Sequence, residues 1–496
     1  MLASLGVQVA TAVYLGAGWE RDALFVAMSV PLFLNSLLAG SVGVVVTPAV
    51  LSSSSPGGQR RLASRLLAYL AVTMVVVAAI LYAFRLPLAG LLAPGFDVDR
   101  RFFTAGLLAL SVTIIPFQAS TSVLTGYLVA KERVLLPSVA LALGNAATLG
   151  SVIFIGSSLT AAHVALATLA GAILACVIQL AVFVQDCRNG DRSLPDSTPN
   201  VSRVCSQALP LILSGLVSRS NPLVERHLAS SLGSGTISCL GYSGYLVSFL
   251  VNATAGPTMT VFYARMCNLW NVGDRDGVGR ILEKSLCYVI TVSLAIGGLL
   301  VLVGADLFHV LFRYTRFTSE GVTDLVTYSK ILMISYLFLA TGGVISRLFY
   351  AAGCSLRVSL LDCLGTFFYA VVAFSLVHPF KGTGLAIAAS IYSIFVVSLF
   401  LGWAYRQFRT RLHREFAATI GMVFLTWGSV FAVAMLVRHL VLQGFPAGFS
   451  SALVALFYLG GLAFVIRFAL RRTGAPWRDP TRRESERPAS LDVFRQ

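Results

Sequence analysis

The sequence lacks the features that would point to an enzyme or an ATP-driven pump. No Gly-Lys pair occurs in its 496 residues, so the G-x-x-x-x-G-K-[ST] loop that cradles ATP phosphates is missing. The 6 histidines show no H-E-x-x-H spacing, and the 8 cysteines are scattered without a C-x-x-C pair. Acidic, basic and metal-binding residues do not cluster near one predicted membrane face. We therefore expect a protein that is not an enzyme and has no cofactor, metal site or disulfide framework.

Charged residues are also scarce. They make up 12% of the chain, whereas 57% of the residues are hydrophobic, and soluble proteins have nearer a quarter and a half. Apolar runs of about 17 to 25 residues recur along the whole sequence, and each is long enough to cross a bilayer as a helix. The composition therefore predicts an all-α polytopic membrane protein. We predict fourteen transmembrane helices at residues 2–17, 22–51, 64–84, 103–129, 134–156, 161–185, 202–231, 236–264, 282–303, 322–352, 357–377, 382–403, 415–440 and 447–472.

The net charge is +16, and the positive residues are distributed along the chain as in a membrane protein rather than as in a protein that binds nucleic acid. With the N-terminus in the cytosol, the inner loops and helix ends hold 26 Lys and Arg residues and the outer loops hold 8. Positive residues accumulate in cytosolic loops of membrane proteins. We therefore expect a multi-pass protein of the bacterial cytoplasmic (inner) membrane with both termini in the cytosol and no nucleic-acid partner.

A polar connection divides the predicted spans into six and eight. We expect an N-terminal six-helix lobe at 1–185, a cytosolic linker at 186–201 and a C-terminal six-helix lobe at 202–403. Two further transmembrane helices would follow at 404–472 and a disordered cytosolic tail at 473–496. The stretch LGAG ends the first span and LGSG ends the seventh, on the same predicted side, which indicates two parallel repeats.

The seventh predicted span is the most polar. Ser218, Asn221 and Glu225 follow one another at helical steps that place them on one face, and Arg219 and Arg226 lie beside them. Because charges inside a membrane are costly, this stripe favours a hydrophilic cavity wall that binds substrate. The alternative is a local ion-pair network of Glu225 with the arginines that only seals helix packing.

Two other predicted spans carry polar residues that could face the same cavity. Tyr245 and Asn252 lie on one face of the eighth span, and Asn35 lies mid-way along the second. We expect these three residues to contact substrate. Aromatic packing with interhelical hydrogen bonds is the alternative for the eighth span.

Four stretches, in order along the chain, resemble the MviN/MurJ-like lipid II flippases of the multidrug/oligosaccharidyl-lipid/polysaccharide exporter superfamily. They are LGAGWERDALFVAMSVPLFLNSLLAGSVGVVVTPAVL, VERHLASSLGSGTISCLGYSGYLVSF, LFRYTRFTSEGV and SRLFYAAGCSLRVSLL. With the fourteen predicted spans, the resemblance covers nearly the whole chain. It implies two six-helix lobes that form a V around a central cavity, plus two C-terminal helices.

The resemblance also implies a function. Such proteins move an undecaprenyl-diphosphate-linked glycolipid, the peptidoglycan precursor lipid II or a related lipid-linked oligosaccharide, from the inner to the outer leaflet by alternating access. The expected partners are this polyprenyl-diphosphate-linked substrate, membrane lipids and enzymes of cell-wall or polysaccharide synthesis. The alternatives are, in order, a flippase specific for exopolysaccharide or O-antigen repeat units, a cation-coupled small-molecule antiporter and a scaffold that does not transport.

The chain departs from this family at the cavity arginines. The family carries them in the first helix, in the middle of the second and near the start of the eighth. Here the first span has no arginine, the second position falls at Asn35 or Ser36, and the eighth-helix position falls at Tyr245. We expect Arg219 and Arg226 to take over the binding of the anionic head group.

The charged corner after the first span holds the residue that matches the acidic corner of the family. The predicted topology places Glu20, Arg21 and Asp22 in an outer loop. We expect Asp22 to hold or gate the outer side of the cavity. The alternative is an acidic residue that only interacts with the N-terminal dipole of its own helix.

Overall fold

The elements that the structure describes are all helices. The computed structural model describes residues 2–51, 56–188, 212–312, 315–408, 414–440 and 450–462, and every element within these ranges is helical. In a bilayer a helix satisfies its own backbone N–H and C=O groups, which is why long apolar runs fold in this way. The all-helical prediction is confirmed.

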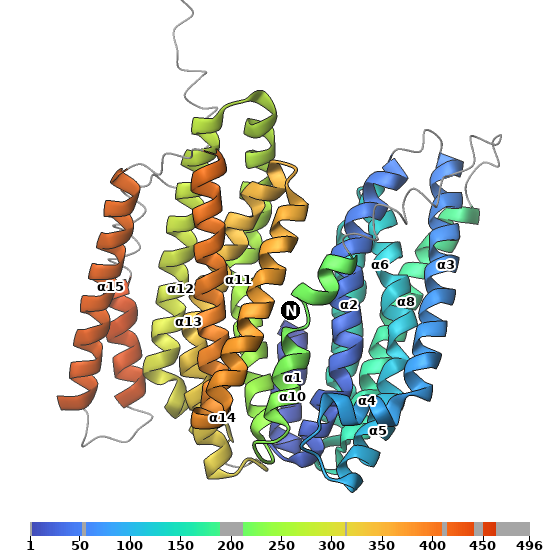
Figure 1. The fold of residues 1–496 in the computed structure, drawn as a ribbon, viewed down its shortest axis with the longest axis horizontal. Coiled ribbons are helices and arrows are strands. Elements are labelled where there is room, and N and C mark those ends of the chain that lie inside the picture. The colour runs from blue at the N-terminus through green and yellow to red at the C-terminus, as the bar shows by residue number, and fades with distance from the viewer. Residues whose placement is uncertain are drawn as a thin grey trace, which may run out of the picture.

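The first half of the chain forms one group of helices on one side of the molecule (Figure 1). This first helix group consists of α1 (Leu2–Leu15), α2 (Trp19–Leu51), α3 (Pro56–Ala83), α4 (Arg85–Leu92), α5 (Val98–Val112), α6 (Ile114–Ala130), α7 (Leu135–Ile155), the short 3₁₀ turn Gly156–Ser158 and α8 (Ala161–Arg188).

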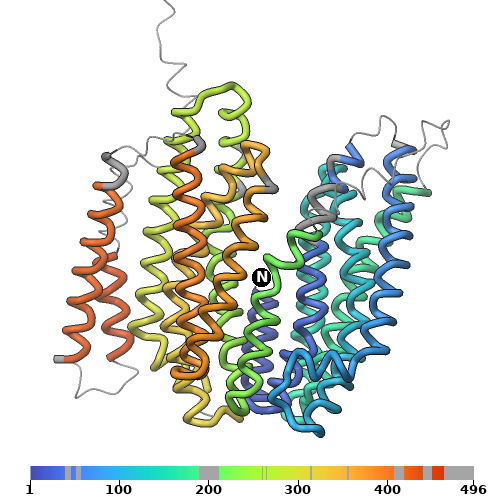
Figure 2. Tube along the Cα trace, in the orientation of Figure 1, coloured from blue at the N-terminus to red at the C-terminus, as the bar shows by residue number. Residues whose placement is uncertain are grey.

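The second helix group stands beside the first (Figures 1 and 2). It consists of α10 (Asn221–Ala229), α11 (Thr236–Val272), α12 (Arg275–Phe312), α13 (Ser319–Ala351) and α14 (Ser355–Phe408). The C-terminal helix pair, α15 (Arg414–Leu440) and the helix at residues 450–462, lies against α12 on the side away from the first group.

The described helices follow the predicted spans closely. Ten segments within the described ranges are long and apolar enough to cross a membrane, and α1 and residues 450–462 are shorter apolar helices. The chain is thus a multi-pass membrane protein. The predicted spans 357–377 and 382–403 are joined in α14, which breaks at Lys381 with φ 51° and ψ −132°. The predicted linker and tail lie almost entirely outside the described residues.

The seventh predicted span differs from a single helix. Within its described part, residues 212–218 are helical, the helix ends before Ser220, and α10 begins at Asn221. Pro222 stands next in the chain and has no backbone N–H to continue the earlier helix. Ser218 and Glu225 therefore lie on different helical segments, and the single polar face inferred from regular helical spacing is interrupted between them.

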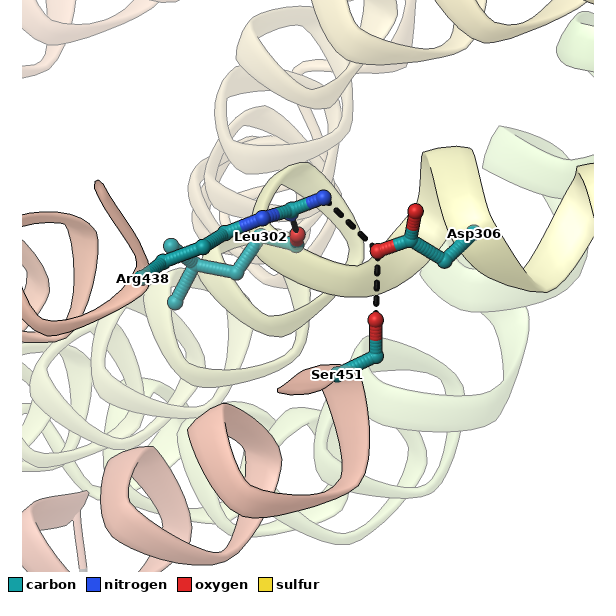
Figure 3. Close-up of polar contacts among 4 residues, drawn as sticks. All are labelled: Leu302, Asp306, Arg438 and Ser451. Atoms are coloured by element: carbon teal, nitrogen blue, oxygen red, sulfur yellow. Dashed lines mark hydrogen bonds and ion pairs between the residues drawn. The ribbon is translucent and has the colours of Figure 1, made fainter. Parts of the chain in front are cut away.

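Polar contacts as well as apolar packing attach the C-terminal helix pair to α12. Arg438 of α15 donates a hydrogen bond to Asp306 Oδ2 at 2.7 Å and another to the carbonyl of Leu302, and Ser451 donates to the same Asp306 oxygen (Figure 3). Deeper in this interface, the hydroxyl of Tyr458 accepts a hydrogen bond from Trp427 Nε1 at 2.7 Å. Asp306 thus ties both helices of the pair to the second helix group.

Removal of Asp306 should loosen this attachment. In an Asp306→Ala variant, Arg438 keeps its charge but loses its carboxylate, and hydrogen bonds to charged groups contribute on the order of 1.5–3 kcal/mol. We expect a lower thermal unfolding midpoint of the purified protein. The double variant Asp306→Leu/Arg438→Met should recover much of the loss because neither charge is left alone. Ser429→Ala on the exposed face of α15 is the control, and equal midpoints for Asp306→Ala and this control would contradict the role of the carboxylate.

Candidate substrate cavity and the contacts that close it

A cavity of about 500 Å³ lies among the helices of the first group. Its wall comes from α1, α2, α6, α7 and α8, with one residue from α11. The lining residues are Ser4, Val7, Gln8, Arg21, Leu24, Phe25, Met28, Leu32, Asn35, Gln118, Thr121, Ser122, Thr125, Leu141, Gly144, Asn145, Thr148, Val164, Thr168, Gly171, Ala172, Ala175 and Tyr245. The volume falls within the roughly 300–1,000 Å³ of sites that bind small ligands.

Uncharged hydrogen-bonding side chains make up much of the wall. Several hydroxyl groups donate to a backbone carbonyl four residues earlier in their own helix, as Thr121 does to Phe117 at 2.8 Å and Ser122 does to Gln118 at 3.0 Å. Each hydroxyl oxygen keeps acceptor capacity that can face the cavity. This wall can thus hydrogen-bond a hydrated or sugar-like molecule without presenting a fixed negative charge.

The predicted site residues fall into two sets. Asn35 and Tyr245 line the cavity. The lining does not include Ser218, Asn221, Glu225 or Asn252; for example, Asn252 Nδ2 donates to the carbonyl of Ser248 in its own helix at 2.8 Å. A substrate role for these four residues stays a prediction.

The two arginines expected to bind the anionic head group make contacts between the helix groups. Arg226 is buried, and its Nε donates to the carbonyl of Phe25 in α2 at 3.1 Å. Its Nη1 donates to the carbonyl of Pro222 at 2.8 Å. Arg219 donates from Nη1 to the carbonyl of Ser36, also in α2. Neither arginine lines the cavity, and both hold the seventh predicted span against α2.

The charged corner is not the solvent-exposed outer loop that the topology predicts. Arg21 and Asp22 belong to the first turn of α2, and their exposed fractions are only 4% and 1%. Sequence criteria predict too late a start for α2, because a cluster of charges is unfavourable inside a membrane unless each charge meets a partner or a cavity. Arg21 lines the cavity and Asp22 meets hydrogen-bond donors, on two different sides of the helix.

Asp22 joins the two helix groups. Its carboxylate accepts hydrogen bonds from the backbone N–H of Gly235 at 2.5 Å and of Ser238 at 2.7 Å, and from the Ser238 hydroxyl at 2.5 Å. These donors stand at the start of α11, where backbone N–H groups have no partner within the helix and the helix dipole favours an anion. Asp22 therefore caps a helix of the other group, not its own.

The two glycine-containing corners of the sequence pack against each other at this end of the molecule. Gly16 has φ 69° and Gly235 has φ 92°, which only glycine adopts without strain. A Cβ on Gly16 would lie 2.6 Å from the carbonyl oxygen of Arg316, and one on Gly235 would lie 3.0 Å from that of Ala17. We call this the glycine-corner end. The close approach explains why both corners carry glycine although only one carries charge.

Further hydrogen bonds close the glycine-corner end around Asp22. All of them join a residue within 1–188 to one within 221–318. They link Tyr242 to the Gly16 carbonyl at 3.2 Å, His227 to the Leu91 carbonyl at 2.7 Å, the Gly95 N–H to Ser230 at 3.1 Å, and Arg316 to the Ser157 carbonyl at 3.1 Å. Hydrogen bonds from several elements thus join the two helix groups at this end.

Arg21 is the charged residue among the cavity residues that sequence reasoning missed. The sequence predicts it to be an outer-loop charge that sets topology. The available signal was its position four residues before Phe25, which places the guanidinium and the ring on the same face of a helix. The described residues contain no group of three or more His, Cys, Asp or Glu side chains that could hold a metal ion.

The chain matches one family model and several curated relatives. The model described as "Lipid II flippase MurJ" matches residues 11–456. The "Probable lipid II flippase MurJ" of Buchnera aphidicola is 20% identical over 472 residues, which cover 91% of this chain and 90% of that protein. The protein of the same name from Rhizobium meliloti is 23% identical over 323 residues. That alignment covers 62% of this chain and 59% of the length of the relative.

Solved structures show the same fold. "Lipid II flippase MurJ, inward closed conformation" superposes with a TM-score of 0.77 at 15% identity, over 95% of this chain and 96% of that chain. An inward-facing multidrug resistance MATE family transporter of the MOP superfamily gives a TM-score of 0.68 at 15% identity, over 82% and 94%.

Substitution of Gly16 should destabilise the glycine-corner end, whereas substitution of Gly18 should not. Gly16→Ala introduces a Cβ at a positive φ and against the Arg316 carbonyl, and each such strain costs on the order of 1–3 kcal/mol. Gly18 belongs to the same corner, and a Cβ there meets no atom within 4 Å. We expect a lower thermal unfolding midpoint for Gly16→Ala alone. If both variants unfold at the same temperature, the corner does not require a tight turn at Gly16.

Proposed function

Because the chain belongs to the MurJ lipid II flippase family, we propose that it moves a polyprenyl-diphosphate-linked glycolipid from the inner to the outer leaflet of the bacterial cytoplasmic membrane. The family match over residues 11–456 carries this proposal, and the polar cavity supports it. A transporter of this class needs no catalytic group, since it only lowers the barrier for moving a polar head through hydrocarbon.

We propose that the described helices belong to a fourteen-helix architecture. The first and second helix groups would be two six-helix lobes, 1–185 and 202–403, that form a V and repeat the same topology. The glycine corners that pack together would occupy corresponding places in the two lobes. The C-terminal helix pair within 404–472 would complete the count, with a linker at 186–201 and a cytosolic tail at 473–496.

We propose that the glycine-corner end faces the outside and that both termini face the cytosol. The distribution of Lys and Arg supports this orientation. The Asp22 contacts would then form the outer gate, and the structure would correspond to a state that receives substrate from the inner leaflet. Release would require the carboxylate to leave the start of α11 and the backbone contacts of Arg219 and Arg226 to break.

In the receiving state the polar head would enter the cavity, where Asn35 and Tyr245 contact it. The prenyl tail would stay in lipid, because its transfer out of hydrocarbon would be unfavourable. The substrate is thus a polyprenyl-diphosphate-linked glycolipid whose sugar is left open. Enzymes of cell-wall or polysaccharide synthesis, which make such lipids, are the partners that this function implies.

Depletion of the protein should trap its lipid substrate on the cytosolic side. We expect the amount of at least one lipid-linked intermediate that is accessible from outside to fall severalfold as the protein is depleted, while its total amount is kept or rises. Accessibility can be measured by enzymatic or chemical modification of the sugar in intact cells, with total lipid extracts as the reference. Unchanged accessibility of every polyprenyl-diphosphate intermediate would rule out the proposed function.

A further inference from the structure

The cavity contains a positive charge that the family resemblance does not assign. Arg21 is the one charged side chain among the residues that line it. No ion pair joins Arg21 to a carboxylate within the described part of the chain, and the neighbouring Asp22 is directed to α11. A buried charge without a counter-ion is costly. A ligand that brings a negative charge into this cavity would compensate for that cost.

Neighbouring groups hold the guanidinium of Arg21 at the cavity wall. Nη2 donates to Gln8 Oε1 at 2.8 Å. The central carbon, Cζ, lies 4.3 Å from the ring centre of Phe25 and 5.1 Å from that of Tyr242, distances at which a cation is attracted to an aromatic ring. These contacts fix the side chain without neutralising it.

Two buried polar atoms at this cavity have no hydrogen-bond partner among the described residues. One is the donor Nε of Arg21, whose side chain is 96% buried, and the other is the acceptor Oε1 of Gln118. Unpaired buried donors and acceptors are rare in folded proteins and call for a ligand or water. Both atoms are buried in this structure, so a ligand would reach them only after their side chains rotate. An anion would then satisfy the first atom and a hydroxyl group the second, and a sugar bound to a phosphate carries both.

The two other arginines that were candidates for anion binding already donate hydrogen bonds to backbone carbonyls. Arg226 donates to the carbonyls of Phe25 and Pro222, and Arg219 donates to that of Ser36. Asn35 and Tyr245, which line this cavity, carry no positive charge. The positive charge of the cavity therefore comes from the start of α2 in this chain.

We infer that Arg21 is the residue that binds the diphosphate of the substrate in this cavity, with Gln118 accepting a hydrogen bond from a sugar hydroxyl. This inference rests on the proposed function for the identity of the ligand. The planar guanidinium can form two parallel hydrogen bonds to a phosphate, whereas a lysine offers only a point charge. Gln8 is a positioning residue that holds the guanidinium toward the cavity.

Binding of inorganic pyrophosphate to the purified full-length protein in lipid nanodiscs tests the inference. We expect Arg21→Gln to weaken pyrophosphate binding by roughly ten- to a hundredfold, as loss of a charge-assisted hydrogen bond implies. The pyrophosphate affinity of Arg21→Lys should lie between those of the wild type and Arg21→Gln. Lysine keeps the positive charge but cannot form two parallel hydrogen bonds to one phosphate. The matched control is Arg85→Gln, since Arg85 also lies over an aromatic ring, 4.5 Å from the centre of Tyr82, but does not line the cavity.

The outcomes separate this inference from the proposed function. Equal pyrophosphate affinity of wild type, Arg21→Gln and Arg21→Lys, or no binding by the wild type, would overturn the assignment even if depletion traps the glycolipid. Binding that depends on Arg21, together with unchanged exposure of all lipid intermediates on depletion, would keep the anion site and remove the glycolipid as its ligand. If Arg21→Gln does not fold, Gln8→Leu, which changes no charge and removes the contact that holds the guanidinium, is the second variant. A severalfold or greater loss of pyrophosphate affinity in Gln8→Leu supports the site, and no loss contradicts it.

Discussion

The contact between the Asp22 carboxylate and the start of α11 is the interaction on which the arrangement of the two helix groups depends. A carboxylate that is 1% exposed is unfavourable in isolation, and here three donors and the helix dipole compensate for its burial. Each hydrogen bond to a charged acceptor contributes on the order of 1.5–3 kcal/mol. The carboxylate and its donors belong to different groups, so these groups cannot separate at the glycine-corner end while the contact lasts. The glycines at 16 and 235 allow the backbones to come close enough for it to form.

The proposed anion site and the contact of Asp22 with α11 share one turn of α2. Arg21 and Asp22 are consecutive, so their side chains leave the helix about 100° apart, one toward the cavity and the other toward α11. Arg21 also lies over the ring of Tyr242, which belongs to α11 and donates to the Gly16 carbonyl. A ligand that draws the guanidinium away from Tyr242 would therefore alter a contact between the groups. Only a ligand that binds the two arrangements with different affinity can shift the balance between them.

Apolar run length and the positions of glycine predicted most of the helices, because in a bilayer the backbone leaves few alternatives to a helix. The same reasoning predicts less of the candidate site. Arg219 and Arg226 have the residue type expected for an anion site, but backbone carbonyls of α2 are their acceptors. Those partners lie 183 and 201 residues away in the sequence, and no local pattern reveals them. The break at Ser220 likewise interrupts a polar stripe that assumes uniform helical steps. Sequence criteria place Arg21 in a loop because they locate membrane boundaries by charge, and a charge inside a cavity violates that assumption.

The distance between the groups at the glycine-corner end tests most directly whether Asp22 closes an alternating-access pathway. Spin labels at the exposed positions Val98 of α5 and Thr323 of α13, in a variant without the native cysteines, would report it by pulsed electron paramagnetic resonance. We predict one short distance for the parent protein and a second, longer population in Asp22→Asn, because an amide cannot accept all three hydrogen bonds. Glu20→Gln, two residues earlier in the same turn of α2, should keep the single short distance. An identical distance distribution in all three proteins would contradict the account.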